Sequence, residues 1–337
     1  MKKLGLKRSI CMILAGCLLL GVAGCSTNQK DNSTKKRKEL TIVLDWTPNT
    51  NHTGLYVAQK LGYFKKAGLN VKIIQPPEDG ASVLVASGQA QFGIDFQDYM
   101  AAALTGDEAL PITAIAAIIQ HNTSGIISLK GKGIESPKGM TGKTYATWDL
   151  PIEKAMLEYL VKKDGGDYNK IKMIPNTVTD VASALQTDID CVWVYYAWDG
   201  IATQVKNIKT DYFALKDFAP ELDYYSPVII GNNQYLKENP AETKAFLRAV
   251  KDGYQYAIKN PEKAANILCG EVPELDKTLV LESQKWLANQ YQADAKNWGE
   301  FDSKRWDNFY KWLYEKKVLA EELKPGTGFT NEFLPMN

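Results

Sequence analysis

The sequence predicts an α/β fold with a mostly parallel sheet, and two observations lead to this class. Short apolar runs of strand length alternate with amphipathic segments of helix length over residues 40–231. From Gln234 onward the pattern changes, and apolar residues recur almost wholly at helical spacing. A sheet made in the first part is therefore expected to be covered by helices, many of them from the second part.

Strands are expected where apolar and β-branched residues stand between turn-forming residues. These runs are Leu40–Asp45, Val71–Gln75, Phe92–Asp95, Ile112–Ile119, Ile126–Leu129, Thr144–Thr147, Lys172–Pro175, Cys191–Tyr195 and Val228–Gly231. Helices are expected in the gaps between them. The predicted helices are His52–Ala67, Ala81–Ser87, Gln97–Leu104, Glu153–Lys163, Val178–Gln186 and Ile201–Lys206.

The helical tail contains Asn-Pro pairs, which are typical of helix starts, within "NPAETKAFLRAVKDGYQYAIKNPEKAANIL". Near its end, "FDSKRWDNFYKWLYEKKVL" places an apolar stripe on one helical face, made of Phe301, Trp306, Phe309, Trp312 and Leu313. A cofactor-binding box is one interpretation of this stripe. We predict instead a helix that docks on the core through its aromatic residues.

Two interruptions predict that the chain leaves one lobe and returns to it. "GKGIESPKG" (131–139) is followed by a fresh strand–helix series, and "DYYSPVIIG" (223–231) precedes the helical tail. We expect residues 39–132 and 229–337 to form one lobe and residues 133–228 the other. Two crossings form a hinge, and loops at the ends of parallel strands would face each other across a cleft.

The N-terminus has the pattern of a secretory signal over residues 1–24. A basic start is followed by a short apolar run and then by "VAGC", which ends at Cys25. The run is short for a membrane span, which needs about 20 residues. "VAGC" resembles a bacterial lipobox, so we expect Cys25 to carry a lipid anchor on the extracytoplasmic face of the cell membrane; ordinary cleavage beside an incidental cysteine is the alternative. Residues 25–38 are polar and are expected to form a disordered tether.

Composition excludes several classes of partner. The net charge is +1 over 337 residues, with no basic patch interleaved with aromatics, so no nucleic-acid partner is expected. Cys191 and Cys269 lack the spacing of a metal motif. Cys191 lies in an apolar run and is predicted to be a buried small hydrophobe, with a Cys191–Cys269 disulfide as the alternative. We expect no metal and no cofactor.

The segment "LDWTPNTNHTGLYVAQKLGYF" (44–64) places an indole, an imidazole and two asparagines between a strand and a helix. Such side chains are more than a plain connection needs, so we expect something to be held there. Together with "VLVASGQAQFGI", "SPKGMTGKT" and "DCVWVYYAWDGI", the segment resembles the NMT1/THI5-like solute-binding proteins of ABC importers over nearly all of residues 39–334. "DWTPNTNH" and "YYAWDG" are the most specific of these stretches.

The resemblance implies a two-lobed type II periplasmic-binding-protein fold that passes its ligand to a permease and its ATPase subunits. It is strongest to the branch that captures pyrimidine precursors of thiamin. The same superfamily contains a pyridoxal-phosphate-using pyrimidine synthase, whose lysine and consumed histidine correspond to Asp95 and Tyr99 here. Neither residue can form a Schiff base or supply an imidazole, so we expect no enzyme activity.

A small aromatic N-heterocycle needs flat faces to stack on and polar groups that contact its edge. We expect Trp46, Tyr195 and Trp198 to supply faces and Asp199 to supply a carboxylate, with Asn49 and Asn51 bonding the edge. Asp199 is the preferred edge residue; its alternative is to stabilise a helix N-terminus. Turn-making and helix capping are equally open for the asparagines, with Asn51 the expected cap.

The remaining polar residues near these loops are weaker candidates. We expect His52 to be a hydrogen-bonding residue at a helix start, and Asp45 to order the loop. Asp95 and Gln97, after the strand at 92–95, and Trp148 and Asp149 in the opposite lobe are secondary candidates for ligand contact. For Trp193 and Tyr196 we favour packing over ligand contact, because strand side chains alternate.

The predicted protein is a lipid-anchored monomer that binds a thiamin pyrimidine precursor for import. Riboflavin or another heterocycle is the alternative ligand within this class, because stacking faces do not specify a ring. An alkylsulfonate or nitrate is disfavoured, since the candidates are acidic and aromatic and include no arginine. A pyridoxal-phosphate enzyme is the alternative from another class.

Overall fold

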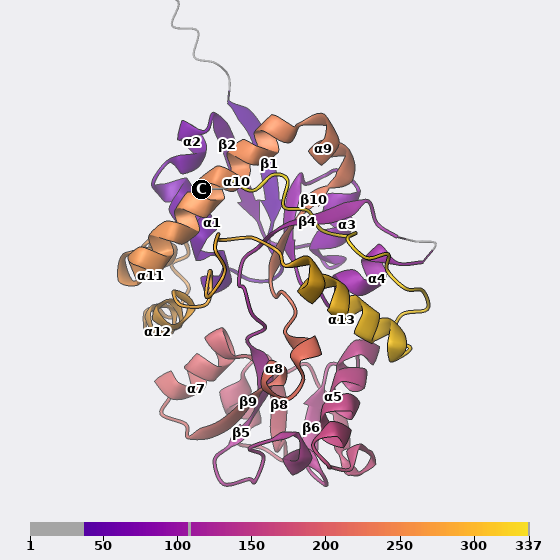
Figure 1. Cartoon of the computed structure of the whole chain (residues 1–337). Coiled ribbons are helices and arrows are strands. Elements are labelled where there is room, and N and C mark those ends of the chain that lie inside the picture. The colour runs from indigo at the N-terminus through magenta and orange to yellow at the C-terminus, as the bar shows by residue number, and fades with distance from the viewer. Residues whose placement is uncertain (1–36, 107–108, 336–337) are drawn as a thin grey trace, which may run out of the picture. The chain divides into compact units, whose positions relative to one another are not determined.

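The computed structural model describes residues 37–106 and 109–335 (Figure 1). The predicted signal sequence, Cys25 and the tether up to residue 36 lie outside the described residues. Lys38, which the sequence analysis placed in the tether, is the first residue of strand β1. In the part of the chain that is described, no helix is both long enough and apolar enough to cross a membrane.

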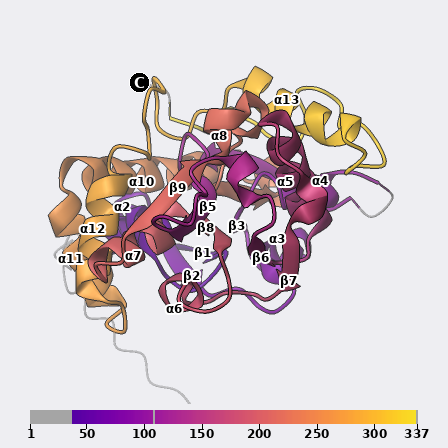
Figure 2. The same ribbon diagram turned by 90° about the horizontal axis from the view of Figure 1, so that it is seen from below.

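Two five-stranded sheets form the framework (Figures 1 and 2). The first sheet has the order β2 (Leu69–Ile74), β1 (Lys38–Val43), β3 (Phe92–Asp95), β10 (Val228–Asn232) and β4 (Ile112–Ala117). The second has the order β7 (Lys172–Pro175), β6 (Thr144–Thr147), β8 (Cys191–Tyr195), β5 (Ser124–Leu129) and β9 (Thr210–Ala214). The nine predicted strands are all present, each within two residues of its predicted bounds.

The sheets are mixed, where the sequence predicted mostly parallel strands. In each sheet two neighbouring pairs are parallel, and a strand that comes from the other sheet makes two antiparallel pairs. These inserted strands are β5 and β10. A parallel neighbour needs a long crossover connection, whereas β5 and β10 enter directly from the other sheet, so they can run antiparallel.

The sheets and the helices packed on them define two lobes, which the chain joins twice. Residues 118–123 lead from β4 to β5, and residues 223–227 return to β10. β5 therefore belongs to the second sheet, although it precedes the glycine-rich segment (131–139) after which the sequence analysis started the second lobe. The two crossings run side by side, since the Ile118 N–H donates to the carbonyl oxygen of Pro227 at 3.0 Å.

The first lobe is covered mainly by helices from the two ends of the described chain. They are α1 (Thr53–Lys60), α2 (Tyr63–Lys66), α3 (Gly80–Ala86), α4 (Met100–Leu104), α9 (Asn233–Glu238), α10 (Pro240–Lys259), α11 (Pro261–Glu271) and α12 (Lys277–Leu287). The predicted helix His52–Ala67 is broken, because Gly62 adopts the left-handed conformation with φ of 74°. That conformation ends α1 and redirects the chain.

The second lobe carries α5 (Pro151–Lys163), α6 (Val181–Ala184), α7 (Ile201–Val205) and α8 (Leu215–Phe218). Short helical turns are η1 (Thr50–His52), η2 (Pro137–Met140), η3 (Tyr168–Lys170), η5 (Pro220–Leu222) and the π-helical turn η4 (Tyr196–Gly200). β9 was not predicted from the sequence; it is an edge strand whose first three residues are only partly buried. Such a strand lacks the continuous apolar run by which the others were found.

The aromatic stripe of the tail docks on the core, as predicted; Phe301 lies just before helix α13 (Ser303–Glu315), and the other four members lie in it. Its five members are all buried. Burying a residue such as Phe309 stabilises the fold by about 1.5–3 kcal/mol. The Trp312 ring also contacts the Tyr159 ring of α5 at 5.3 Å, so α13 spans from the first lobe to a helix of the second.

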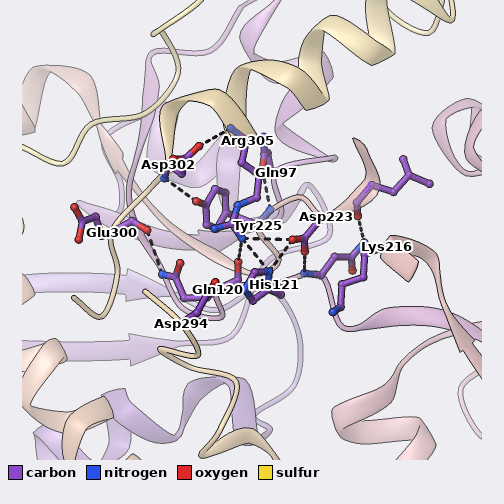
Figure 3. Close-up of polar contacts among 12 residues, drawn as sticks. Gln97, Gln120, His121, Lys216, Asp223, Tyr225, Asp294, Glu300, Asp302 and Arg305 are labelled. Atoms are coloured by element: carbon purple, nitrogen blue, oxygen red, sulfur yellow. Dashed lines mark hydrogen bonds and ion pairs between the residues drawn. The ribbon is translucent and has the colours of Figure 1, made fainter. Parts of the chain in front are cut away.

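A polar cluster holds the two crossings together (Figure 3). The Asp223 carboxylate bonds His121 Nδ1 at 2.7 Å and accepts from the Asn122 N–H at 3.0 Å. The other ring nitrogen of His121 lies 2.9 Å from Asp294 Oδ1. Arg305 of α13 lies over the Tyr225 ring at 4.4 Å, and its guanidinium nitrogen lies 3.2 Å from His121 Nδ1.

Cys191 and Cys269 are both buried and free, so the alternative of a disulfide between them is wrong. Cys191 is the buried small hydrophobe that the sequence predicted. Among residues 37–106 and 109–335, no three His, Cys, Asp or Glu side chains are grouped so that they could hold a metal ion.

Candidate functional site

The candidate site lies where the carboxyl ends of parallel strands from the two sheets meet. In the first sheet, Trp46 follows β1 and Asp95 ends the parallel strand β3. In the second, Trp148 follows β6 and Tyr195 ends the parallel strand β8. Carboxyl ends of parallel strands share one edge of a sheet, and ligands of open α/β sheets bind at that edge.

Aromatic rings join the two edges. Phe96, directly after β3, stacks on Tyr195 with ring centroids 5.4 Å apart and planes 22° apart. Tyr99 meets Phe96 edge to face at 5.4 Å, and Trp148 lies 5.8 Å from Trp193. Trp193 and Tyr195 are two apart in β8, so their side chains point to the same face. We call these five residues the interlobe aromatic cluster.

The Trp193 side chain adds a polar feature to this cluster. The residue is only 5% exposed, and its indole Nε1 has no hydrogen-bond acceptor among the described residues. A buried donor without a partner costs about 1–3 kcal/mol. The cluster therefore has stacking faces and one donor that a ligand acceptor could satisfy, whereas the sequence favoured packing over ligand contact for Trp193.

Two buried carboxylates lie at the carboxyl end of β3, with Asp95 as its last residue and Asp98 three residues later. Asp95 accepts from the Ser82 hydroxyl and from the Phe96 N–H at 2.7 Å, and burial raises its pKa to about 6. Asp98 is near the Tyr224 hydroxyl, at 3.3 Å from Oδ2, and burial raises its pKa to about 7. Desolvation disfavours the charged form, so both groups exchange protons near neutral pH.

The loop after β1 is built by its own polar residues. Asn49 caps η1 by accepting from the Asn51 N–H at 2.8 Å, and its amide donates to the Thr47 carbonyl oxygen at 3.1 Å. The predicted cap was Asn51, which is wrong, because Asn49 has the extended backbone that places its side chain over the turn. Asn49 therefore has the turn-making role that the sequence offered as its alternative.

His52 is a hydrogen-bonding residue at a helix start, as predicted. Its Nδ1 accepts from the Asn49 N–H at 3.1 Å, which leaves the proton on Nε2, 2.6 Å from Asp45 Oδ1. The ring is fully buried, and Asp45 orders the loop through it. Trp46, at the tip, is 47% exposed, and Asn51 is half-buried with its carbonyl oxygen bonded by the Tyr254 hydroxyl at 2.6 Å.

Two of the secondary candidates have other partners. Gln97 is fully buried and exchanges hydrogen bonds with the backbone of Tyr225, which fixes the β3–α4 loop to the second crossing. Asp149 is exposed and pairs with Lys154 at 2.5 Å. Gln97 and Asp149 therefore have structural roles, and neither side chain is part of the interlobe aromatic cluster.

The motif "YAWDG" forms the π-helical turn η4, and its residues point in different directions. Trp198 packs against an apolar cluster of the first lobe that contains Tyr56, Leu268 and Val280, so its ring is used for packing rather than as a face of the site. Asp199 is half-buried, and burial raises its pKa to about 6, with Asp180 adding to the rise. Asp199 lies four residues after the end of β8, within η4, and keeps its place among the proposed edge residues.

Phe96 and Tyr99 were missed as ligand-contact candidates, although a signal for them was present. Phe96 directly follows the strand at 92–95 and Tyr99 lies three residues further on, in "GIDFQDYM", where the carboxyl-end rule applies. A surface hollow of about 470 Å³ lies elsewhere, beside α13 and the second crossing, and is lined by Glu221, Asp223, Arg305 and Trp312 among others. The candidate site is therefore defined by its side chains and not by this hollow. In this conformation the Phe96 and Tyr195 rings are in contact between the two sheet edges.

The architecture matches that of periplasmic binding proteins. The periplasmic aliphatic sulphonate binding protein SsuA from Escherichia coli aligns with a TM-score of 0.66 over 85% of this chain and 95% of that chain, at 12% identity. At this identity the likeness concerns the fold alone. The chain has the two-lobed type II periplasmic-binding-protein fold that the sequence predicted.

Residues 49–264 match the family model described as "NMT1/THI5 like", and the chain belongs to that family. It is 28% identical over 326 residues to the formylaminopyrimidine-binding protein of Halalkalibacterium halodurans, covering 90% of this chain and 94% of the relative. It is also 25% identical over 316 residues to the 4-amino-5-hydroxymethyl-2-methylpyrimidine phosphate synthase THI13 of Saccharomyces cerevisiae, covering 88% of each. Relatives thus include a binding protein and a synthase.

Proposed function

We propose that this protein is the solute-binding component of an ABC importer and binds a thiamin pyrimidine precursor such as formylaminopyrimidine between its lobes. The observation that carries the proposal is the interlobe aromatic cluster, where flat rings from both strand-end edges meet beside buried carboxylates. The fold and the binding-protein relative support the same class.

The chemistry of an aminopyrimidine suits these side chains. Its flat ring can stack between Trp148 and Tyr195, and an aromatic pair contributes about 0.5–1.5 kcal/mol beyond area burial. A ring nitrogen can accept from the Trp193 indole N–H. A carboxylate of Asp95 or Asp199 can accept from an exocyclic amine, and bonds to ionised groups are the stronger kind. Trp46 and Asn51, on the loop after β1, would close over the ligand when it is seated.

The proposal includes a place for the protein in the cell. Cys25 would carry the lipid anchor on the extracytoplasmic face of the membrane, and the segment after it would be the tether. Two acyl chains hold a protein firmly, at about 0.8 kcal/mol per buried CH₂. The folded part would act as a monomer, with lobes meeting at the 118–123 and 223–227 crossings, and would deliver its ligand to a permease with ATPase subunits.

Riboflavin, or another flat nitrogen heterocycle, is the second ligand that stacking faces can accept. The synthase relatives raise an enzyme as the alternative from another class. Against catalysis stand Asp95 and Tyr99 at the two places that correspond to the synthase lysine and histidine. Asp95 is instead a buried acceptor for Ser82 and the Phe96 N–H, and its chemistry cannot supply a Schiff base.

Calorimetric titration of residues 26–337 tests the proposal. The ligands are formylaminopyrimidine, hydroxymethylpyrimidine, thiamin, riboflavin and pyridoxal phosphate. We expect a pyrimidine to bind, and Trp148→Ala to weaken it by roughly tenfold, which is the loss of about 1.4 kcal/mol of stacking. The matched control is Tyr314→Ala, which removes an exposed aromatic ring on α13 and should leave binding unchanged.

Each ligand outcome has a distinct meaning. Binding of riboflavin alone keeps the importer class and rejects the pyrimidine. Pyridoxal phosphate that binds with an absorbance change favours the enzyme alternative. Pyrimidine binding that Trp148→Ala and Tyr314→Ala weaken equally would contradict the position of the site.

A further inference from the structure

The π-helical turn η4 is one part of the second lobe that docks on the first. Three consecutive residues make the contact: the Tyr196 ring lies 5.4 Å from the Trp286 ring of α12, Ala197 is buried in a first-lobe cluster with Leu55, and Trp198 packs on α11 and α12. Figures 1 and 2 both show α12 beside α7, the helix that continues from η4.

One buried hydroxyl provides the polar link across this contact. Ser283 of α12 is fully buried, and its Oγ lies 2.6 Å from the Thr50 hydroxyl and bonds the carbonyl oxygen of Ala197. A carbonyl only accepts, so the single Ser283 proton goes to Ala197. Ser283 Oγ must then accept the proton of Thr50.

Thr50 is itself held firmly in the first lobe. Its carbonyl oxygen accepts from the Tyr291 hydroxyl at 2.6 Å and from the Thr53 hydroxyl at 3.0 Å. The chain of bonds therefore runs from the loop after β1, through α12, to η4. At each end it reaches residues next to proposed ligand contacts: Asn51 follows Thr50, while Tyr195 and Asp199 flank residues 196–198.

We propose that Ser283 is a positioning residue that couples closure of the lobes to the ligand site. The part of this proposal that concerns ligand release rests on the proposed function. The part that concerns closure of the lobes rests only on the contacts of Ser283 with Thr50 and Ala197. When the lobes separate, the Ala197 carbonyl is free to bond water. When they close without the Ser283 hydroxyl, that carbonyl is buried with no donor from Ser283, which disfavours the closed form.

Ser283→Ala should therefore open the lobes and speed ligand release. With formylaminopyrimidine as the probe, stopped-flow tryptophan fluorescence should show an off-rate roughly tenfold faster and an on-rate little changed, the usual division of such effects. Thr50→Val removes the other hydroxyl of the chain without changing side-chain size. In a double-mutant cycle, Thr50→Val should change the off-rate less when Ser283→Ala is already present.

The matched control is Thr203→Val. Thr203 is fully buried and donates to the Gly200 carbonyl oxygen at 2.7 Å, so the variant removes a similar bond within one lobe. It should lower the melting temperature without changing the off-rate. A merely structural role for Ser283 would give the same result as this control.

A second measurement needs no ligand. Spin labels at Lys259→Cys on α10 and Asp188→Cys in the second lobe, both exposed positions, report the distance between the lobes by pulsed electron resonance. In the labelled protein without further changes, the label-to-label distance of this structure should be populated with or without the pyrimidine. Ser283→Ala should reduce that population, and Thr203→Val should not. Its absence in the unchanged protein, or equal populations in both variants, would overturn the proposal.

The two arms separate this inference from the proposed function. If no pyrimidine binds, the proposed ligand fails, and the label distances alone decide the role of Ser283. If the pyrimidine binds but Ser283→Ala matches Thr203→Val in off-rate and in distance, the proposed role of Ser283 fails and the ligand stands.

Discussion

At the scale of single residues, the buried acids at the end of β3 set how the protein responds to pH. Asp95 and Asp98 both have raised pKa values because they are buried, about 6 and about 7. In the unfolded chain each would titrate near its ordinary value of 3.8. Between these values the folded state binds more protons than the unfolded state, so the free energy of unfolding falls as pH rises.

Asp98→Asn should remove part of that dependence. At pH 8 the ionised carboxylate is costly, at about 1.4 kcal/mol for each unit of pKa shift, so the variant should gain about 1–4 kcal/mol of stability. At pH 5 both the native carboxyl and the amide are neutral, and the gain should be small. Urea denaturation at the two pH values measures it, and an equal effect at both would contradict the burial of this charge.

At the scale of elements, the crossing of α1 over α10 depends on two glycines. A Cβ on Gly253 would lie 2.0 Å from the carbonyl oxygen of Gly54, and one on Gly54 would lie 2.4 Å from the Tyr254 ring. The close approach lets Tyr254 reach the Asn51 carbonyl oxygen at the loop after β1. The helix packing therefore positions one side of the candidate site.

Gly253→Ala should destabilise the protein by about 1–3 kcal/mol, because overpacking forces the two backbones apart. The control is Gly270→Ala in α11, where a Cβ meets no atom within 4 Å. There the substitution should stabilise by about 0.5–1 kcal/mol, since alanine loses less conformational freedom in a helix. Chemical denaturation of both variants gives the comparison, and a Gly253→Ala protein as stable as the unchanged one would refute the close crossing.

At the scale of the whole molecule, the cluster at the crossings ties both connections to the C-terminal helix α13. His121 lies in the first crossing and Asp223 at the start of the second, with Asp294 and Arg305 facing the same imidazole (Figure 3). The bond to Asp223 raises the pKa of His121, with Asp294 adding to the rise and with burial and Arg305 opposing it. The stabilisation from this imidazolium is fully present below about 6.5, the pKa of histidine in the unfolded chain. It is lost as the pH rises through the higher pKa of His121 in the folded protein.

Asp223→Asn should therefore cost more stability at pH 5.5 than at pH 8.5. An amide cannot pair with the imidazolium, and a hydrogen bond to a charged group contributes about 1.5–3 kcal/mol. Asp217→Asn is the control, since Asp217 is 65% exposed and its pair with Lys216 is 3.9 Å long. Equal losses from Asp223→Asn at both pH values would show that His121 stays neutral.

Much of the fold could be predicted because its signals are local. β3, β6, β7 and β8 have their predicted bounds, since each is a short apolar run between turn-forming residues. β9 had no such run, because an edge strand needs to bury only part of itself. The direction of β5 and β10 also escaped prediction, because it depends on which sheet each strand enters.

Within the site, the sequence by itself determined which loops carry it. Trp148, Tyr195 and Asp95 were found because they follow or end strands, and that position depends on neighbours along the chain. His52 and Asn49 were weighed for turn-making roles on the same basis. Such features are local in sequence, and each can be predicted from the residues that flank it.

Only the tertiary structure decided which of these side chains meet. It brought Phe96 onto Tyr195, turned Trp198 into the packing of the first lobe, and placed Ser283 between Thr50 and Ala197. These partners lie up to 233 residues apart in the chain. Contacts of that kind depend on how the two lobes pack on each other. A local pattern of polar and apolar residues does not determine that packing.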